Sequence, residues 1–321
     1  MRVPGGSHSR PPPYYPSGAA SVVPHRTRVL VYNVKFLPLL GRVLERPLLN
    51  TRGFWEIGEV VRTDETRAAI IADLLTRDPR FDVVILCEVF ADHARKTFAE
   101  AFARRGYHVA TCPPVRGFGV FTSSGLFVAT RLPILDRAFL PYRTAMGSDR
   151  FARKGILHLR LGVRDRALDL FATHLQAGVG ARAARRLQLR HARAFIDART
   201  RHSPTIPTLL GGDLNVIGEH STGHPTEEYV AMREILDGFT DVHHVLTQGR
   251  PHPTWNPLEN AQMIGDRYGD LERLDYLLVR GDDAERALAS DASVEVLRFE
   301  HDGLPLSDHY ALAFELPLIT P

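Results

Sequence analysis

The chain has 321 residues, 44% of them hydrophobic and 24% charged, which is enough for a globular protein with a large core. Its formal net charge of +3 suits anionic ligands in general and does not single out nucleic acid. The two cysteines are too few for a structural zinc site or a disulfide framework.

Neither a membrane span nor an export signal is visible in the sequence. No apolar stretch reaches the roughly 18 residues of a transmembrane helix, and the N-terminus lacks a basic segment followed by an apolar one. We therefore expect a soluble, cytoplasmic protein by default, with peripheral membrane contact or non-classical export as alternatives. Residues 1–25 are rich in Pro, Gly and Ser and are predicted to form a disordered tail, followed by one domain over residues 26–321.

The first half of the chain alternates strands with helices. Residues 28–34 form a predicted strand that ends in polar residues, and residues 35–61 are predicted to be a loop with short helical turns. A helical period follows over residues 63–77. Residues 81–88 are almost continuously apolar and end in an acid, which is typical of a central strand covered on both faces. A second helix is predicted over residues 91–105.

Hairpins appear in the middle of the chain. Strands are predicted at residues 107–111 and 125–130, and a clear hairpin joins residues 155–163 to 167–173. Residues 181–199 form a predicted Arg-rich amphipathic helix. Its predicted inward face consists of Ala184, Leu187, His191, Ala194 and Phe195. The remaining predicted elements are a strand at 208–210, a helix at 227–236, and strands at 274–279, 294–298 and 310–316.

Early alternation of strands and helices, followed by hairpins, indicates an α/β fold. A mixed sheet, or two packed sheets, with helices on the outside would bury the apolar faces of these elements. No internal repeat or linker divides the chain, so one domain is expected.

Polar residues recur where these apolar strands end or begin. They are Asn33, Glu88, His174, Asp213, Asn215, Asp275, Asp308 and His309. In α/β folds, ligand-binding groups gather at strand ends. Asp213 and Asn215 lie two residues apart, so on an extended chain both side chains point to the same side. The sequence therefore predicts one site built from several strand ends.

The residue types predict metal-assisted hydrolysis of a phosphate ester. Glu88 and Asp308, with Asn33 alongside, supply the oxygen ligands that Mg²⁺ prefers. His309 is a candidate general base that Asp275 could orient.

The other strand-end residues have candidate roles at the phosphate. His174 and Asn215 could donate hydrogen bonds to the phosphorus centre, and Asp213 could position water or bind metal. The simpler alternatives are that His174 is an ordinary core histidine and that Asp275 pairs with Arg273.

Six motifs carry a resemblance that covers residue 27 to the end. They are Tyr32-Asn33-Val34, Glu88-Val89-Phe90, Thr173-His174-Leu175-Gln176-Ala177, Gly212-Asp213-Leu214-Asn215-Val216, Leu274-Asp275-Tyr276 and Ser307-Asp308-His309-Tyr310. In this order they resemble the endonuclease/exonuclease/phosphatase superfamily. The Val-Phe after Glu88, the His-Leu-Gln-Ala run, Lys154-Gly155 and Thr254-Trp255 resemble its neutral sphingomyelinase (phospholipase C type) branch.

The resemblance implies a four-layered α/β/β/α sandwich, with two packed mixed β-sheets flanked by helices. It implies a Mg²⁺-dependent phosphodiesterase, with Mn²⁺ and Co²⁺ as candidate substitutes, acting on sphingomyelin or a related phospholipid at a membrane surface. The implied roles are Glu88 as metal ligand, Asn33 and Asp308 near the metal, His309 as base with Asp275, and His174 and Asn215 at the phosphate. No protein partner is implied, and a monomer is expected.

One departure from that branch concerns membrane contact. Secreted bacterial members carry a late hairpin with an aromatic tip, whereas residues 293–306 here contain only Phe299 as an aromatic. Either the substrate differs or another apolar segment meets the membrane. The candidates for that segment are Phe36, Leu37, Leu39, Leu40, Phe54 and Trp55.

Two other functions are weighed against the phospholipase. A nuclease or an inositol-phosphate phosphatase could use the same scaffold. Nucleic acid is the less favoured substrate, because the charge is modest and the arginines of residues 181–199 lack interleaved aromatics. A catalytically inactive binding module would lack Glu88, Asp213 or His309, and all three are present.

Overall fold

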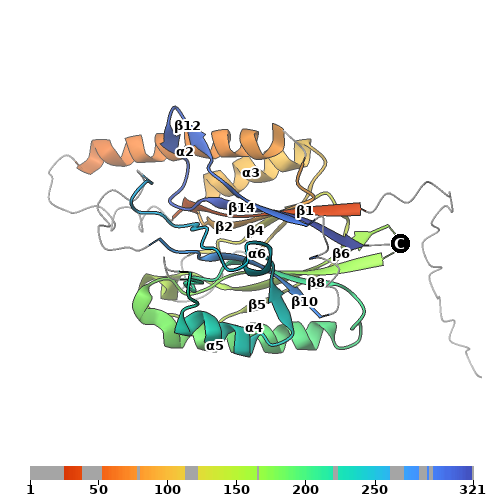
Figure 1. Ribbon diagram of the computed structural model, residues 1–321. Coiled ribbons are helices and arrows are strands. Elements are labelled where there is room, and N and C mark those ends of the chain that lie inside the picture. Colours follow the sequence, from red (N-terminus) through yellow and green to blue (C-terminus); the bar gives the residue numbers. More distant parts are fainter. Residues whose placement is uncertain are drawn as a thin grey trace, which may run out of the picture.

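Two β-sheets pack face to face between two layers of helices (Figure 1). The computed structural model describes residues 25–37, 53–77, 80–112, 122–164, 166–219, 223–260, 271–281, 288 and 292–319. This arrangement confirms the predicted α/β/β/α sandwich. Residues 1–24 of the predicted tail lie outside the described residues, and the first strand begins at His25, one residue before the predicted domain boundary.

The first sheet has the strand order β11-β14-β1-β2-β4-β3. Its strands are β1 (His25–Phe36), β2 (Val83–Val89), β3 (His108–Thr111), β4 (Phe127–Thr130), β11 (Ser293–Leu297) and β14 (Ala311–Ile319). β1 and β2 run parallel, so their carboxyl ends meet at one edge. β2 is buried along nearly its whole length, as its continuous apolar run predicts.

The second sheet has the order β5-β6-β7-β8-β10-β9. Its strands are β5 (Ile134–Pro141), β6 (Gly155–Val163), β7 (Arg166–His174), β8 (Thr208–Asp213), β9 (Phe239–Asp241) and β10 (Asp275–Arg280). The hairpin of β6 and β7 is confirmed, while β5 on its outer side was not predicted. β7 and β8 run parallel, so this sheet also has two carboxyl ends side by side.

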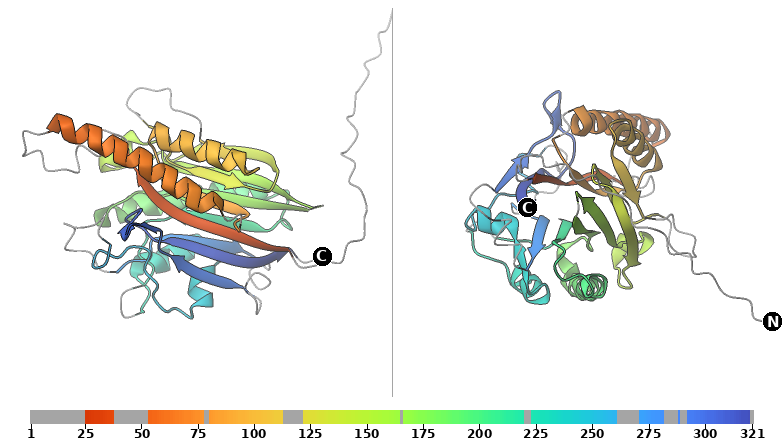
Figure 2. Two further views of the ribbon diagram at one scale, coloured as in Figure 1. Left: turned by 90° about the horizontal axis from the view of Figure 1, so that it is seen from above. Right: turned by 90° about the vertical axis from the view of Figure 1, so that its right-hand side faces the viewer.

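Helices cover the outer face of each sheet, as the end-on view in Figure 2 shows. α2 (Gly53–Arg77) and α3 (Asp92–Arg104) lie on the first sheet, and α4 (Arg182–Thr200) and α5 (Glu227–Ile235) on the second. The short elements are α6 (Val242–Leu246), the 3-10 turns η1 (Gly147–Phe151) and η2 (Val179–Ala181), and the hairpin of β12 (Glu300–His301) and β13 (Leu304–Pro305). None of the helices in the described part of the chain is long and apolar enough to cross a membrane.

The predicted loop at residues 35–61 is partly wrong. β1 continues to Phe36, and α2 begins at Gly53, ten residues before the predicted helix. Phe36, a candidate for membrane contact, is fully buried and meets the ring of Phe98 edge-on, with 5.6 Å between centroids. It belongs to the core beneath α3, where apolar burial stabilises the fold. Leu39, Leu40 and the side chains of Phe54 and Trp55 lie outside the described residues.

The predicted inward face of α4 is wrong in part, since Ala184 is buried and Phe195 packs against the core as predicted. Leu187 and Ala194 are exposed, and the residues facing the sheet include Arg185, Gln188, Leu189 and Ile196. Arg185 and Gln188 turn inward because their polar ends find partners there. The Arg185 guanidinium makes two bonds to Glu228, at 2.7 and 2.9 Å, and the Gln188 amide donates to the Thr144 carbonyl at 2.8 Å.

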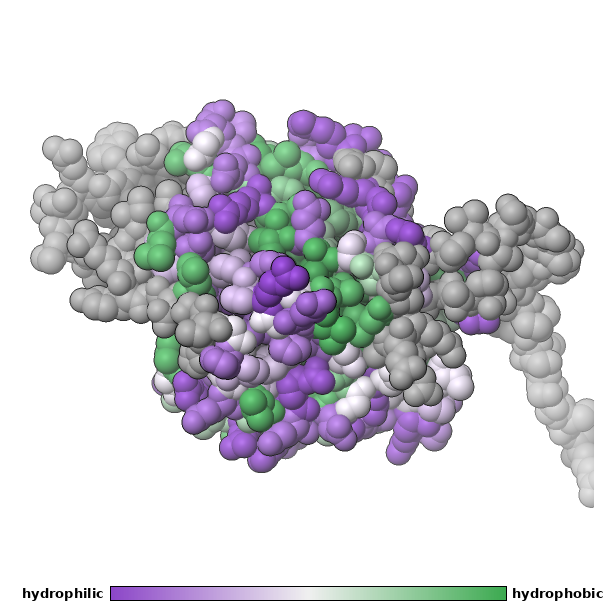
Figure 3. All heavy atoms as spheres, viewed as in Figure 1, coloured by the Kyte–Doolittle hydropathy of each residue, from purple (hydrophilic) through white to green (hydrophobic). Residues whose placement is uncertain are grey.

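The apolar core has three parts, one between the sheets and one beneath each helical layer. Figure 3 shows that hydrophilic residues cover most of the face seen in Figure 1, with hydrophobic residues gathered near its middle. The core therefore holds the two sheets in a fixed position relative to each other. It thereby also fixes the carboxyl ends of β1, β2, β7 and β8.

Candidate active site

Strand ends from both sheets converge at one edge of the sandwich. In the first sheet, Asn33 of β1 pairs in register with Cys87, the residue before Glu88 of β2. In the second, Asp213 at the end of β8 pairs with both His174 of β7 and Asp275 of β10. The predicted residues are thus brought together by register, although they come from distant parts of the chain.

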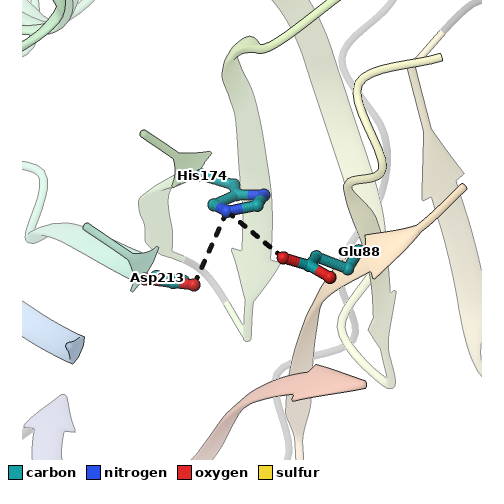
Figure 4. Close-up of side chains that lie close together, drawn as sticks. All are labelled: Glu88, His174 and Asp213. Atoms are coloured by element: carbon teal, nitrogen blue, oxygen red, sulfur yellow. Dashed lines mark ion pairs between the residues drawn. The ribbon is translucent and has the colours of Figure 1, made fainter. Parts of the chain in front are cut away.

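Glu88, His174 and Asp213 form one cluster (Figure 4). His174 Nε2 lies 3.8 Å from Glu88 Oε1 and 3.5 Å from Asp213 Oδ2. One ligand atom from each residue lies within 4.8 Å of the other two. The side chains of His174 and Asp213 are buried, while that of Glu88 is 17% exposed, which leaves the cluster open on the Glu88 side.

His309 and Asp275 form a second group that shares Asp213. His309 Nδ1 lies 2.8 Å from Asp275 Oδ2, and His309 Nε2 lies 3.9 Å from Asp213 Oδ2. Trp255 meets the imidazole edge-on, with 5.3 Å between ring centroids. The partner of Asp275 is therefore His309, whereas Arg273 binds Glu219 and Asp241 instead.

Electrostatics within this second group favour the charged imidazole. Burial lowers the pKa of His309, but Asp275, Asp213 and Asp308 outweigh it and raise the value to about 10. Asp275 thus both orients the ring and stabilises its positive charge.

The carboxylates of the first cluster have raised pKa values. Burial, with the charge of Asp308, raises the pKa of Glu88 to about 7 against the opposing effect of Lys154. Burial also raises the pKa of Asp213 to about 6, against the opposing charge of His309. Negative charge is therefore costly here in the absence of a cation. Carboxylate oxygens with such an unmet demand for positive charge fit a hard divalent ion.

Asn33 and Asp308 have partners of their own. The Asn33 amide donates to Asp213 Oδ2 at 2.9 Å, and its oxygen accepts the Lys35 backbone N–H at 3.1 Å. Asp308 Oδ2 lies 2.8 Å from Lys35 Nζ. Burial raises the pKa of Asp308, but His309 and Lys35 together bring it below its usual range. Within the described residues, Asp308 does not join the clusters of His, Cys, Asp and Glu ligand atoms that contain Glu88 and Asp213.

Asn215 sits in a turn that Asp213 stabilises. Its backbone N–H donates to Asp213 Oδ1 at 2.9 Å, and its amide donates to the Leu175 carbonyl at 3.3 Å. Asn215 has φ +51° and Glu88 has φ +62°, a left-handed conformation that non-glycine residues rarely adopt. Such backbone strain gathers at functional sites, and here it marks two of the predicted residues.

Lys154 is a site residue that the sequence did not single out for a role. Its Nζ is buried and lies 3.2 Å from His174 Nε2, 2.7 Å from Asp149 Oδ2 and 2.8 Å from the Leu175 carbonyl. An ammonium group can only donate, so Nε2 accepts, and His174 is neutral with its proton on Nδ1. Burial, followed by the charge of Lys154, lowers the pKa of His174 well below its usual value. The one signal in the sequence was the Lys154-Gly155 pair that opens β6.

The chain resembles proteins of one family in sequence and structure. Residues 48–309 match the endonuclease/exonuclease/phosphatase family. A sphingomyelinase of Dictyostelium discoideum is 25% identical over 263 residues, which cover 62% of this chain and 57% of that protein. Sphingomyelin phosphodiesterase 5 of Danio rerio is 26% identical over 182 residues, or 51% of this chain and 33% of that protein. The chain thus matches little more than half the length of one relative and a third of the other.

Solved structures share the fold over nearly the whole chain. SmcL superimposes with a TM-score of 0.71 and 21% identity, covering 92% of this chain and 100% of that one. Sphingomyelinase C from Streptomyces griseocarneus gives 0.68 and 22%, covering 91% and 99%. A beta toxin from Staphylococcus aureus with bound magnesium ions gives 0.68 and 19%, covering 90% and 99%. At these identities the likeness establishes the fold.

Proposed function

Because the chain belongs to the endonuclease/exonuclease/phosphatase family, we propose that it is a metal-dependent phosphodiesterase. The proposed substrate is sphingomyelin or a related phospholipid, cut between the lipid oxygen and phosphorus as by a phospholipase C. The observation that carries the proposal is the His309–Asp275 pair, whose free Nε2 faces the cluster of Asp213, Glu88 and His174. The matches to sphingomyelinases support the choice of lipid.

Glu88 and Asp213 are the residues we propose to hold a divalent cation, with Asn33 and Asp308 beside them. The magnesium ions of the related beta toxin support Mg²⁺, with Mn²⁺ and Co²⁺ as candidate substitutes. A bound divalent cation would neutralise charge on the phosphate oxygens and so favour attack at phosphorus. The raised pKa values of Glu88 and Asp213 give the metal a further effect, since its charge stabilises both ionised carboxylates.

His309 is the proposed general base, and Asp275 its positioning partner. To take a proton from water, the imidazole must be neutral at Nε2, the nitrogen that faces Asp213. The carboxylates that raise the pKa of His309 include Asp213. A cation bound at Asp213 would therefore oppose that rise and make the neutral base more accessible.

His174 and Asn215 have proposed roles at the phosphate, and Lys154 refines the role of His174. Lys154 donates to His174 Nε2, so this nitrogen accepts rather than donates in the resting state. We expect Lys154 to position His174 beside Glu88 and to contribute positive charge near the phosphate. Asn215 keeps one amide hydrogen beyond its bond to Leu175 and can offer it to a phosphate oxygen.

The contacts of α4 weaken the nuclease alternative. Arg185 binds Glu228, Arg193 binds Asp197, and Arg199 contacts both His158 and Asp136. Arg185 is therefore structural, and the partly exposed ion pairs of Arg193 and Arg199 leave less of their charge for a phosphate backbone. The inactive-module alternative is weakened by the way Glu88, Asp213 and His309 come together at one edge.

An activity assay tests the proposal. Purified protein with Mg²⁺ should release phosphocholine from sphingomyelin or phosphatidylcholine and leave plasmid DNA intact, and EDTA should abolish the release. His309→Ala should reduce turnover about a thousandfold, the scale of general-base catalysis. His301→Ala is the matched control, because that histidine lies on the exposed β12–β13 hairpin. Turnover that survives His309→Ala would refute the mechanism, and DNA cleavage without lipid turnover would refute the substrate.

A further inference from the structure

A surface beside the site is built from two chain segments that Gln176 joins. We define the η1–η2 surface as residues 143–151 and 177–182. Gln176 Oε1 accepts the Met146 backbone N–H at 2.7 Å, and its amide donates to the Met146 carbonyl at 3.2 Å. Asp149 Oδ2 accepts the Ala177 N–H at 2.9 Å. These bonds hold η1 and η2 together as one continuous surface.

Large apolar side chains are exposed on both parts of this surface. Met146 is 47% exposed, Phe151 45% and Val179 68%. A single exposed apolar residue is ordinary in a globular protein. Three of them on adjoining segments, around a buried glutamine that fixes their backbone, point to a contact with an apolar partner.

The charge of the η1–η2 surface is positive. Arg143 and Arg150 are exposed, and Arg182 keeps 58% of its side chain exposed although its Nε lies 3.7 Å from Glu228 Oε2. The only acidic residue in the two segments is Asp149. The Asp149 side chain is 16% exposed, and its Oδ2 lies 2.7 Å from Lys154 Nζ. The buried Lys154 ammonium therefore neutralises the charge of Asp149. The outward field is therefore that of the arginines.

The η1–η2 surface borders the proposed active site directly. Lys154, which binds Asp149 beneath the surface, also contacts His174 at 3.2 Å. Gln176 follows His174 by two residues in the chain. A partner lying on this surface would therefore present its nearest groups to the site.

We infer that the η1–η2 surface docks on membranes that contain anionic phospholipids. Apolar side chains can enter the interfacial region, while arginines keep their charged ends at the lipid phosphates. Attraction of basic residues to an anionic leaflet adds to this binding. The inference extends the proposed function, because the active site would then meet its lipid substrate at the bilayer surface.

Other candidates for the contact or the partner fit less well. The β12–β13 hairpin exposes Leu304, but it also exposes Glu300 and Asp302, which an anionic membrane would repel. Single-stranded nucleic acid would suit the arginines. However, Phe151 is the one aromatic among the three exposed apolar side chains, whereas sites for single-stranded nucleic acid stack successive bases on several aromatic rings.

Vesicle co-sedimentation tests the inference with the 321-residue chain in EDTA, where the proposed metal-dependent turnover is absent. Wild-type protein should bind vesicles of phosphatidylcholine with phosphatidylserine far more tightly than phosphatidylcholine alone, and added salt should weaken the binding. The triple variant Arg143→Gln/Arg150→Gln/Arg182→Gln should bind about a hundredfold more weakly, from about fivefold per arginine. Val179→Glu and Phe151→Glu should each weaken binding as well.

Matched variants away from the surface provide the controls. Arg77→Gln/Arg104→Gln/Arg105→Gln removes the same charge at the ends of α2 and α3, on the other sheet. Leu135→Glu changes an exposed leucine near the start of β5, whose opposite end pairs with Gly155. Both controls should bind vesicles like the wild type. Equal loss in the controls, or no loss in the triple arginine variant, would overturn the inference, as would arginine-dependent binding of an oligonucleotide in place of vesicles.

A soluble substrate separates this inference from the proposed function. Turnover of p-nitrophenylphosphocholine with Mg²⁺ requires the active site but no membrane. Arginine-dependent vesicle binding without such turnover would support the docking surface and count against the phosphodiesterase. Turnover without vesicle binding would support the phosphodiesterase and count against the docking surface.

Discussion

At the scale of single residues, Gly212 is the position where β7 and β8 leave no space for a side chain. It has φ +138°, and a Cβ there would lie 1.9 Å from the Thr173 carbonyl oxygen. Gly212→Ala should therefore cost about 3 kcal/mol or more, from backbone strain and the displaced strand. Urea unfolding would measure the loss.

Gly180→Ala is the control for that substitution, because no heavy atom lies within 4 Å of its Cβ position and its φ is not positive. It should change the free energy of unfolding little. If both variants had the midpoint of the wild type, the close approach of β7 and β8 at Gly212 would be wrong.

Asp275 controls the protonation of His309, and removing its charge should lower the pKa of the histidine. In the metal-free protein the pKa of His309 is raised to about 10, with Asp275 as the largest favourable influence against burial. In Asp275→Asn, NMR titration of the His309 ring should give a clearly lower value. Asp302→Asn beside exposed His301 should leave His309 unchanged. An unaltered His309 titration in Asp275→Asn would contradict the pairing.

Residue types at strand ends made most of the site predictable. Asn33, Glu88, His174, Asp213 and His309 interrupt apolar runs, and such interruptions are visible without a structure. For Lys154 the only signal was the Lys154-Gly155 pair, because lysines are mostly exposed and its burial depends on contacts with Asp149 and His174. Its role could only be seen once β6 and β7 were paired.

At the scale of elements, a buried ionic group ties the second sheet to its connections. Arg273, just before β10, bonds Glu219 at 2.6 and 2.9 Å and Asp241 of β9 at 2.9 Å. Arg273→Met removes the guanidinium from two buried carboxylates and leaves Glu219 with His244 and Asp241 with the Tyr229 hydroxyl, so it should cost about 3–5 kcal/mol in unfolding experiments. Arg280→Met, whose arginine binds half-exposed Asp197, should cost about 1 kcal/mol or less. Equal costs for the two variants would refute the structural importance of the buried group.

Elements with one strongly apolar face were predictable, whereas those with polar inward contacts were not. The burial of Ala68, Ile71, Ala72 and Leu75 on α2 follows from their spacing. On α4, alanines occur on both sides, and the face toward the sheet is chosen by the bonds of Arg185 and Gln188. Hydrophobic periodicity does not register these polar partners, so the predicted face included Ala184 correctly but missed Arg185 and Gln188.

At the scale of the whole molecule, a buried neutral histidine should make stability depend on pH. Burial, aided by the charge of Arg273, lowers the pKa of His243 from 6.5 to about 3. Below about pH 6.5, His243 therefore binds a proton in the unfolded chain, whereas in the folded protein it stays neutral until about pH 3. Its contribution to stability falls as the pH drops, by up to about 1.4 kcal/mol per pH unit.

Comparison of variants isolates this contribution from those of other titrating groups. The free energy of unfolding of His243→Phe should fall less steeply than that of the wild type between about pH 6.5 and pH 4. His301→Phe, at an exposed position, should keep the wild-type slope. Parallel curves for all three proteins would show that His243 does not titrate as described.

The layered fold was predictable from the order of elements, since alternating strands and helices followed by hairpins leave few ways to bury every apolar face. The edge strand β5 was not, because none of its residues is fully buried and its apolar pattern is weak. The start of α2 was also missed, because scattered Gly and Pro before it indicated a loop.

The two sheets each supply half of the proposed site. The first sheet supplies Asn33 and Glu88, together with His309 just before β14. The second sheet supplies His174, Asp213 and Asp275. Cys87 Sγ lies across this boundary, 3.5 Å from the Asp213 nitrogen and 3.8 Å from the Thr173 oxygen. Under the proposed function, catalytic activity would therefore require the two sheets to be docked. A folding intermediate with only one of the two sheets formed would be inactive. Activity should return during refolding only when the two sheets pack together at Cys87.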